Sequence, residues 1–390
     1  MKQGWEIQRF EDCFKLKSGD GLTSKNMSED GTYPVFGGNG VAGLHNDFNL
    51  SGSNVIIGRV GALCGNVRHM IEKIWLTDNA FKIVDYKYDF DHSFLTYLLN
   101  FKNLREYARQ AAQPVISNSS LKDVVLEFPK SLTEQQRIVA ILDEAFAAIA
   151  KAKANAKQNL KNAKVLFESY LRGVFENKGE GWVNATIGET CNLQTGGTPS
   201  TSKKEFYEGG TIKWLVSGDI NQKVINDCEG RITELGMNSS NTKYLPINSV
   251  LIALNGQGKT RGTVAMLRTK ATCNQSLVSI FPKDEKSLLP ELVFSNLEGR
   301  YDEIRKMTGD SGNDRRGLNM PLIRSIKFSY PKKINEQKEI IKKLDDLRSV
   351  TKKLEAIYQQ KINDLEELKK SILQKAFNGE LKTKKIEFYV

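Results

Sequence analysis

Residues 129–138 read PKSLTEQQRI, and residues 331–340 read PKKINEQKEI. The two segments share proline, lysine, glutamate, glutamine and isoleucine at matching positions 202 residues apart. The same spacing still relates Phe175 to Phe377, so the match extends far beyond the motif itself. A long self-match of this kind predicts a duplicated structural element.

Apolar residues recur every three or four positions after each motif. In the first copy they stand at positions 138, 142, 145, 149, 152, 156, 163, 167, 170 and 174. This spacing predicts an amphipathic helix with a coiled-coil seam over about five heptads. The second copy repeats the seam with two polar interruptions, at Thr351 and Lys361. We expect the two helices to pair in antiparallel orientation, because the chain between them can turn back.

Both helices carry signals for their ends. Each motif begins with a proline, which blocks an earlier helix start. Thr133 with Gln136 predicts a capping box for the first helix, and Asn335 predicts the N-cap of the second. Asn177 and Asn378, each close to a glycine, predict the C-terminal ends.

The segments that precede the two helices also match each other. Gly4-Trp5 recurs as Gly181-Trp182, 177 residues later, so the second segment has gained residues in its interior. Short β-branched runs that end in glycine-rich turns occur at 53–61 and 249–256. Each segment also contains a short helical stretch before a last apolar strand.

The sequence therefore predicts an α+β fold. It has two mixed, β-rich domains separated by a two-helix antiparallel coiled coil. The predicted boundaries are 1–132 and 178–334 for the domains, 133–177 and 335–378 for the helices, and 379–390 for a C-terminal tail.

Composition places the chain among globular proteins. It has 390 residues, of which 39% are hydrophobic and 26% charged, and this length suits two or three domains. No run approaches the ~18 uncharged apolar residues that a membrane span needs, and charges stand where a signal peptide needs an apolar run. Five cysteines without a CxxC spacing predict neither a disulfide framework nor a zinc site. We therefore expect a cytoplasmic protein with no membrane partner.

Two motifs suggest catalysis, and neither has the context that catalysis needs. Residues 253–260 match a relaxed phosphate loop, but the next residues read as a turn and a strand, where a phosphate loop needs a helix N-terminus. Residues 36–40, FGGNG, resemble an adenine-methyltransferase loop, but the chain has no Asp/Asn-Pro-Pro-aromatic tetrapeptide. Three histidines without an i,i+4 pair indicate no metal site. Two alternative functions remain: a nucleoside triphosphatase that uses Lys259 and Thr260, and a coiled-coil scaffold without DNA function.

Side chains that can read base edges stand in glycine-rich loops of both segments. The net charge of +11 suits a polyanionic partner. Arg and Lys reach guanine O6 and N7, and Asn and Gln pair with adenine. We expect DNA contacts from Asn39, Arg59 and Arg68 in the first segment, from Asn255, Gln257, Lys259 and Arg261 in the second, and phosphate contacts from Arg315 and Arg316.

This duplicated arrangement resembles the DNA-specificity subunits of type I restriction-modification systems. The matching features are Gly-Trp at the start of each segment, GGTPS at 196–200, a strand and glycine loop at 250–262, Asn-Gln at 274–275, and Pro-x-x-x-x-Glu-Gln at the start of each helix. Together they cover nearly all 390 residues.

The resemblance implies two target-recognition domains, with the paired helices as a spacer between them. It implies a chain that does no chemistry itself and needs no cofactor. The implied partners are double-stranded DNA, two modification subunits that methylate adenine, and restriction subunits that translocate and cut DNA.

The resemblance also implies roles for particular residues. Thr198 is expected to contact DNA, and partner contacts are expected from Glu134, Gln135, Glu336 and Gln337. The first segment has Ser18-Gly19-Asp20-Gly21 and lacks an equivalent of Gly-Gly-Thr-Pro. Two unlike domains imply a bipartite, asymmetric target.

Overall fold

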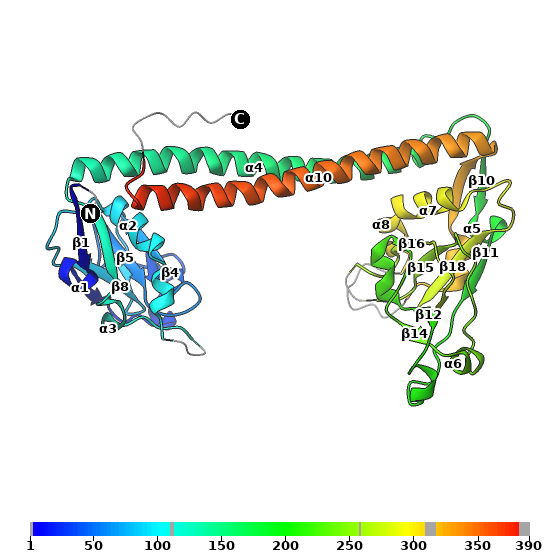
Figure 1. Ribbon diagram of the computed structural model, residues 1–390, viewed down its shortest axis with the longest axis horizontal. Helices are drawn as coiled ribbons and strands as arrows, with labels where there is room; N and C mark the ends of the chain where they lie inside the picture. The colour runs from blue at the N-terminus through cyan, green and yellow to red at the C-terminus, as the bar shows by residue number, and fades with distance from the viewer. Residues whose placement is uncertain (1–2, 110–112, 257–258, 309–316, 382–390) are drawn as a thin grey trace. The chain divides into compact units, whose positions relative to one another are not determined.

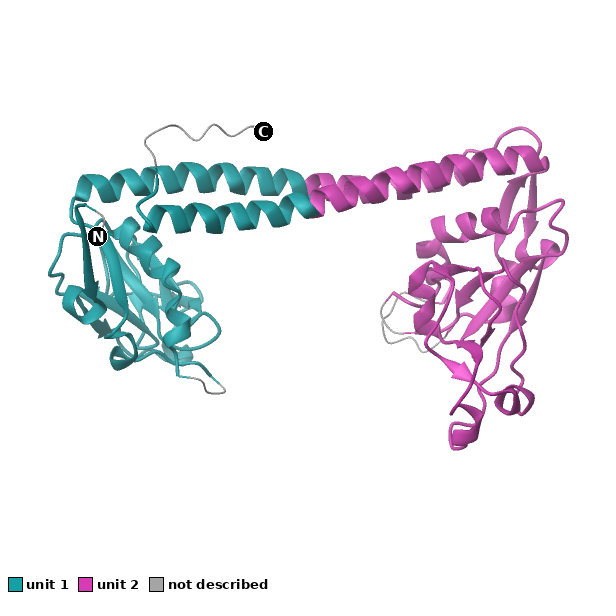
Figure 2. Cartoon of the chain, in the orientation of Figure 1, with its two compact units in different colours: residues 1–157, 360–390 teal, residues 158–359 magenta. Residues whose placement is uncertain are grey.

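The computed structural model describes residues 3–109, 113–256, 259–308 and 317–381. Two compact units make up the chain (Figure 2). Unit 1 comprises Met1–Lys157 and Gln360–Val390, and unit 2 comprises Gln158–Gln359. Each unit combines a body of strands and short helices with parts of both long helices, which confirms the α+β class.

The body of unit 1 is built from three sheets. Its elements are β1 (Trp5–Arg9), α1 (Phe10–Cys13), β2 (Lys15–Ser18), η1 (Ser24–Asn26), β3 (Tyr33–Gly37), β4 (Gly40–His45), β5 (Asn54–Gly58), β6 (Val67–Met70), β7 (Trp75–Leu76), β8 (Ala80–Val84), α2 (His92–Phe101), η2 (Leu104–Tyr107), α3 (Asn118–Leu121) and β9 (Val125–Pro129). The strand orders are β1-β9, β2-β8-β5-β6 and β4-β3-β7.

The body of unit 2 repeats this plan with additions. Its elements are β10 (Trp182–Thr186), α5 (Ile187–Thr190), β11 (Cys191–Thr195), η3 (Lys204–Phe206), β12 (Ile212–Leu215), η4 (Ser217–Gln222), β13 (Val224–Ile225), β14 (Arg231–Ile232), α6 (Glu234–Asn238), β15 (Val250–Ala253), β16 (Val264–Leu267), β17 (Thr272–Cys273), β18 (Leu277–Pro282), α7 (Pro290–Gly299), α8 (Tyr301–Lys306), α9 (Met320–Ser325) and β19 (Lys327–Pro331). The strand orders are β10-β19, β11-β18-β15-β16-β13 and β14-β12-β17. The added residues lie mainly between β11 and β15, in β13, β14, α6 and the loops around them.

Side chains of the larger sheet alternate between two buried faces in each unit. In β5, Val55 and Ile57 join the cluster that contains α2. Ile56 joins a second cluster, which includes Leu76 of the β4-β3-β7 sheet. In β15, Val250 and Leu251 divide between faces in the same way. Figure 1 shows α2 and α7 beside the long helices, each against its own sheet. The period-two alternation of each strand therefore serves two cores.

The long helices are α4 (Leu132–Glu176) and α10 (Ile334–Phe377). In unit 1 the start of α4 packs against the end of α10, and Lys153 forms an ion pair with Glu366. In unit 2 the end of α4 packs against the start of α10, where the Arg348 guanidinium lies 4.7 Å from the ring centre of Phe167. Both contacts are antiparallel, as predicted. None of the described helices combines the length and apolar composition needed to cross a membrane.

The seam differs from the predicted one near the end of α4. Tyr170 is 41% exposed, and Leu171 and Phe175 are buried in its place. These two side chains join the core that contains α7, so this end of α4 faces the body of unit 2 as well as α10. The predicted seam position Leu368 is also exposed.

The predicted N-caps of both long helices are wrong by two residues. Because α4 begins at Leu132, the side chain that accepts a hydrogen bond from the Glu134 amide, at 3.4 Å, belongs to Ser131 and not to Thr133. Because α10 begins at Ile334, Asn335 lies inside the helix. The predicted C-terminal ends are confirmed, and Gly379 has the left-handed φ of 69° that favours glycine.

Candidate nucleic-acid interface

Four loops of unit 1 meet at one surface of its body. The amide of Asp20 donates to the carbonyl of Leu76 at 3.0 Å. The amide of Thr77 donates to the carbonyl of Phe36 at 2.9 Å. The amide of Arg59, in the β5–β6 hairpin, donates to Asn79 at 3.0 Å. These bonds join the loops after β2, β3 and β5 to the turn before β8.

Unit 2 makes the same three bonds with its own residues. The amide of Gly197 donates to the carbonyl of Cys273 at 3.0 Å. The amide of Asn274 donates to the carbonyl of Leu215 at 2.9 Å, and the amide of Leu254 donates to the carbonyl of Ser276 at 2.9 Å. Asp20 therefore matches Gly197, Thr77 matches Asn274, and Arg59 matches Leu254. The two units share one backbone framework for these loops.

This framework corrects the expectation that the first segment lacks an equivalent of the Gly-Gly-Thr run. Gly19 and Gly196 occupy one position, where a Cβ atom would collide with the carbonyl of Leu76 or Cys273. Only glycine lets the loop pass this close to the neighbouring strand. The Ser-Gly-Asp-Gly run of unit 1 is thus the backbone equivalent of the run in unit 2, with different side chains.

Two side chains meet above this loop in unit 2. Thr198 donates a hydrogen bond from Oγ1 to Oε1 of Gln275, and both residues are exposed. They line a polar groove of about 650 Å³ together with Gly196, Gly197 and residues 238–241. The framework places Gly21 and Asp78 of unit 1 at the corresponding positions, so the chemistry differs where the backbone does not.

A buried threonine holds the groove in shape. Thr242 is 4% exposed, accepts a hydrogen bond from the Gly197 amide at 3.0 Å, and lies 2.6 Å from the Gly197 carbonyl. Neither Thr242 nor Gln275 is among the DNA contacts predicted from the sequence. The Asn-Gln pair at 274–275 carried a signal for Gln275, whereas only the fold reveals Thr242.

The three residues predicted in the first segment lie at the loop surface of unit 1. The Oδ1 atom of Asn39 accepts from the Leu63 amide at 2.9 Å, and the Arg59 guanidinium lies 5.2 Å from the ring centre of Phe81. Arg68 lies beside Gly40, and burial lowers the pKa of its guanidinium. All three belong to one surface, but Asn39 and Arg59 also stabilise it from within.

The residues predicted in the second segment lie in the β15–β16 hairpin. The Lys259 carbonyl accepts from the Tyr301 hydroxyl at 3.0 Å, and in unit 1 the Ala62 carbonyl accepts from the Arg105 guanidinium at 2.6 Å. Asn255 and Lys259 are exposed, and Arg261 is half-buried. Gln257, Arg315 and Arg316 lie outside the described residues. Strand β16 begins at Val264, so the hairpin is followed by a strand, as predicted.

The glutamines at the starts of the long helices are internal. Gln135 is 0% exposed; its Oε1 accepts from the Asp91 amide at 2.8 Å, and its Nε2 donates to the carbonyls of Asp89 at 3.1 Å and Pro129 at 2.9 Å. A side chain with no exposed surface cannot contact a partner subunit. The expected partner contact is therefore wrong for Gln135.

Gln337 repeats these contacts in unit 2. It is also 0% exposed, accepts from the Leu289 amide at 2.9 Å, and donates to the carbonyls of Ser287 at 2.9 Å and Pro331 at 2.8 Å. We call Gln135 and Gln337 the glutamine clamps. They fasten each long helix to its own body, which corrects the expected partner contact for Gln337 as well.

The neighbouring glutamates remain at the surface. Glu134 pairs with Arg137 at 2.7 Å, and this hydrogen bond lowers the pKa of its carboxyl. Glu336 pairs with Lys333 at 3.3 Å. Both carboxylates stay available to a partner at matched positions of the two helices.

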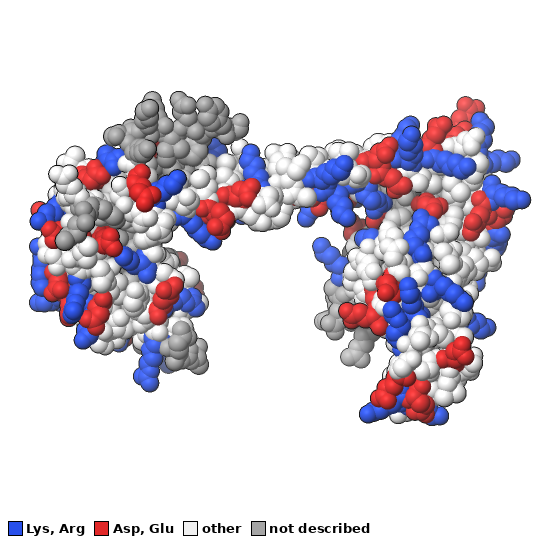
Figure 3. Space-filling model, in the orientation of Figure 1, with Lys and Arg blue, Asp and Glu red and all other residues white. Residues whose placement is uncertain are grey.

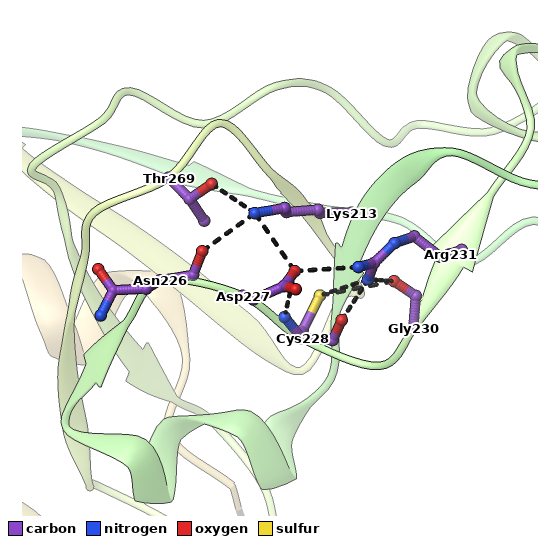
Figure 4. Close-up of polar contacts among 7 residues, drawn as sticks. All are labelled: Lys213, Asn226, Asp227, Cys228, Gly230, Arg231 and Thr269. Carbon is purple, nitrogen blue, oxygen red and sulfur yellow. Dashed lines mark hydrogen bonds and ion pairs between the residues drawn. The ribbon is translucent and has the colours of Figure 1, made fainter.

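Charged groups elsewhere in unit 2 neutralise one another. In Figure 4 the Lys213 ammonium donates to the Asn226 carbonyl at 3.0 Å and lies 3.2 Å from the Asp227 carboxylate, which also pairs with Arg231 at 3.0 Å. The pKa of Asp227 is lowered, first by the Cys228 amide and then by Lys213. The Lys213 and Arg231 side chains therefore stabilise the loop before β14 through these contacts.

Surface charge alone does not locate an interface. Figure 3 shows basic and acidic side chains interspersed on the visible face of both units. Among the described residues, no group of three or more His, Cys, Asp or Glu side chains is arranged to hold a metal ion. The matched loops are therefore the better guide to where ligand contacts lie.

Comparison with known proteins gives the family. Residues 2–162 and 179–367 match the family described as the type I restriction modification DNA specificity domain. The chain belongs to this family. The specificity-subunit architecture predicted from the sequence is thereby confirmed.

Relatives and solved structures agree with the assignment. The chain is 30% identical over 242 residues to the EcoR124I/EcoR124II specificity subunit of Escherichia coli, and 26% identical over 209 residues to the HindI specificity subunit of Haemophilus influenzae. These matches cover 60% and 52% of this chain, but only 58% and 42% of the two relatives.

Two solved structures share the fold along the whole chain. One, from a study of the assembly and conformational transition of the type I R-M system, has a TM-score of 0.78 at 17% identity and covers 98% of this chain and 99% of its own. The other, the HsdS subunit from Thermoanaerobacter tengcongensis, has a TM-score of 0.60 at 17% identity and covers 98% of both chains. At this identity the likeness describes the fold.

Proposed function

We propose that this chain is the sequence-specific DNA-recognition subunit of a type I restriction-modification complex. The observation that carries the proposal is the pair of matched loop surfaces, which have the same backbone bonds but different exposed side chains. Two loop surfaces with the same backbone and different side chains suit a target with two half-sites of unlike sequence. The target is therefore bipartite and asymmetric.

Each unit offers its own base-reading chemistry. Unit 2 presents Gln275, held by Thr198, together with Asn255, Lys259 and Arg261. A carboxamide pairs with adenine, and Lys or Arg reaches guanine. Unit 1 presents Asn39, Arg59 and Arg68, and Asp78 takes the position of Gln275. A carboxylate accepts from the cytosine amino group. Unlike half-sites follow from these unlike side chains.

The chemistry of modification and restriction belongs to partner subunits in this proposal. Two modification subunits methylate adenine, restriction subunits translocate and cut DNA, and this chain directs both to the target without catalysing either reaction. Glu134 and Glu336, at matched helix starts, are the proposed partner contacts. The complex works on double-stranded DNA in the cytoplasm.

A double substitution of Lys259 and Arg261 to Ala tests the proposal in the complex with modification subunits. Each lost base contact weakens binding by about 1–3 kcal/mol. The variant should therefore discriminate less between bases at the half-site read by unit 2. Sequencing of methylated sites should show an unchanged sequence at the other half-site. Binding should also weaken steeply with salt, because phosphate contacts release counterions.

The alternative functions give different results in the same experiment. A triphosphatase that uses Lys259 and Thr260 would lose ATP hydrolysis in the variant and keep target choice. Strand β16, directly after the hairpin, argues against it because no helix N-terminus faces a phosphate there. A scaffold without DNA function would show no salt-dependent DNA binding in the assembled complex.

A further inference from the structure

Unit 2 contains a cavity at the end of its body that adjoins the long helices. It has a volume of about 950 Å³ and lies between the end of α4, helices α7 and α8, and strands β10 and β19. Its lining includes Arg172, Phe175, Asn296, Gly299, Lys306 and Lys327. Pockets for small molecules usually measure about 300–1,000 Å³.

The corresponding place in unit 1 is filled by side chains. There the ring of Phe101, at the end of α2, stacks on Phe377 at a centroid distance of 4.9 Å. The spacing of 202 residues matches Phe377 with Phe175. The glutamine clamps match Asp91 with Leu289, and counting along α2 and α7 then matches Phe101 with Gly299. Unit 2 therefore has a glycine where unit 1 has this ring, and that glycine lines the cavity.

The same count matches a core leucine with an asparagine. Leu98 is 0% exposed in the apolar core of unit 1. Asn296 is 2% exposed, lines the cavity of unit 2, and its Oδ1 atom has no hydrogen-bond partner. A buried acceptor without a partner destabilises the folded protein. Unit 1 shows that the fold accepts leucine here, so packing does not explain the carboxamide.

Charge at the rim favours an anionic group on the ligand. Five basic and four acidic side chains line the cavity, which leaves a small positive excess. Glu303 pairs with Arg300 at 2.7 Å, and Glu189 accepts from the Thr186 amide at 2.6 Å. Arg172, Lys306 and Lys327 also line the cavity. Guanidinium and ammonium groups are the side chains that bind phosphate.

We propose that this cavity binds an aminopurine nucleotide. The Asn296 carboxamide presents an acceptor beside a donor, which pairs with the amino group and adjacent ring nitrogen of adenine. Arg172, Lys306 and Lys327 neutralise the phosphates. The site is separate from the hairpin that contains Lys259, and the proposal stands independently of the DNA-recognition function.

The test is equilibrium binding of ATP, AMP, adenosine and inorganic phosphate to the purified full-length chain. Asn296→Leu, which installs the residue of unit 1, should weaken AMP and adenosine binding by about tenfold or more, the loss expected for a paired base contact. Arg172→Met with Lys327→Met should weaken ATP and AMP by about tenfold or more and leave adenosine within about twofold, because only phosphate contacts are lost.

Matched control variants distinguish this cavity from the other basic surfaces of the chain. Lys332→Met, which lies just beyond strand β19, and Lys259→Ala in the hairpin should leave all affinities unchanged. The melting temperature of Asn296→Leu should equal or exceed that of the parent, because an unpaired buried acceptor is removed. Absence of nucleotide binding would overturn the proposal. So would phosphate binding as tight as AMP, or AMP binding that Asn296→Leu leaves intact.

Discussion

The two units agree closely near their strands and diverge at two places. Backbone bonds that join Asp20 to Leu76 and Gly197 to Cys273 are the same, and the glutamine clamps make the same three contacts in each unit. The exposed loop side chains differ, and the position of a stacked aromatic pair in the core of unit 1 corresponds to a cavity in unit 2. The two units therefore share main-chain geometry and differ in side-chain chemistry.

The largest expected effect comes from breaking the clamps, which tests whether the shared framework is equally important in both units. Gln135→Ala and Gln337→Ala should each lower the free energy of unfolding of their own unit by roughly 3 kcal/mol or more, because three backbone groups lose a buried partner at about 1–3 kcal/mol each. Native-state amide hydrogen exchange, resolved by unit, measures the loss. The Asp91 and Leu289 amides should lose protection first.

Matched neighbours provide the control for this experiment. Gln136→Ala and Lys338→Ala, which are exposed and also 202 residues apart, should change stability by less than about 0.5 kcal/mol. A loss confined to one of the two clamp variants would show that the framework is not shared energetically.

A reciprocal exchange at the loop surface sharpens the comparison at the place where the units differ. Gln275→Asp gives unit 2 the residue of unit 1, and Asp78→Gln does the reverse. Each should change preference at one base of one half-site by about 1–3 kcal/mol, with the other half-site unaffected. Sequencing of methylated sites after reconstitution with modification subunits measures the shift.

An exposed amide outside the groove serves as the control for added charge. Asn192→Asp, on β11 of unit 2, should leave both half-sites unchanged. If Gln275→Asp also leaves both unchanged in an active complex, Gln275 does not read a base.

The smallest expected effect is a pH dependence that only unit 1 can show. All three histidines, at 45, 69 and 92, lie in unit 1. The pKa of His92 is lowered from its ordinary value of 6.5, mainly by burial and then by His69, against the opposing charge of Asp91. Because the unfolded chain binds the proton more tightly, the stability of unit 1 should fall as pH drops through 6.5.

Denaturation monitored separately in each unit between pH 7.5 and about 5.5 measures this dependence. His92→Asn should remove it from unit 1, and unit 2 should show none in this window. An equal decline in both units would assign the effect to other groups.

The long helices were predictable because their signal is repeated many times along the chain. Ile138, Leu142, Ala145 and Ile149 occupy the seam as the spacing predicts. The error at Tyr170 arises at the end of α4, where Leu171 and Phe175 join the core of the unit 2 body and Tyr170 is left exposed. Periodicity identifies a buried stripe but not how many partners bury it.

The candidate site was predictable only in outline. Glycine-rich loops and the Asn-Gln pair indicated the surface, but the match of Gly19 with Gly196 depends on main-chain contacts that leave no common side-chain pattern. Gln135 and Gln337 mislead in the opposite direction. The repeated Glu-Gln pair suggests a surface shared with a partner, but both glutamine side chains are buried and bind backbone groups of their own unit.

The division of the long helices between the units sets an order of completion during synthesis. Unit 2 is continuous in sequence, from Gln158 to Gln359, and all of its core residues have been made before the last part of the chain. The core of unit 1 contains Ile372, Ala376 and Phe377, the last turns of α10. Unit 1, whose body leaves the ribosome first, is therefore the unit whose core is completed last. A chain that stops before Ile372 retains every residue of unit 2 and lacks part of the core of unit 1.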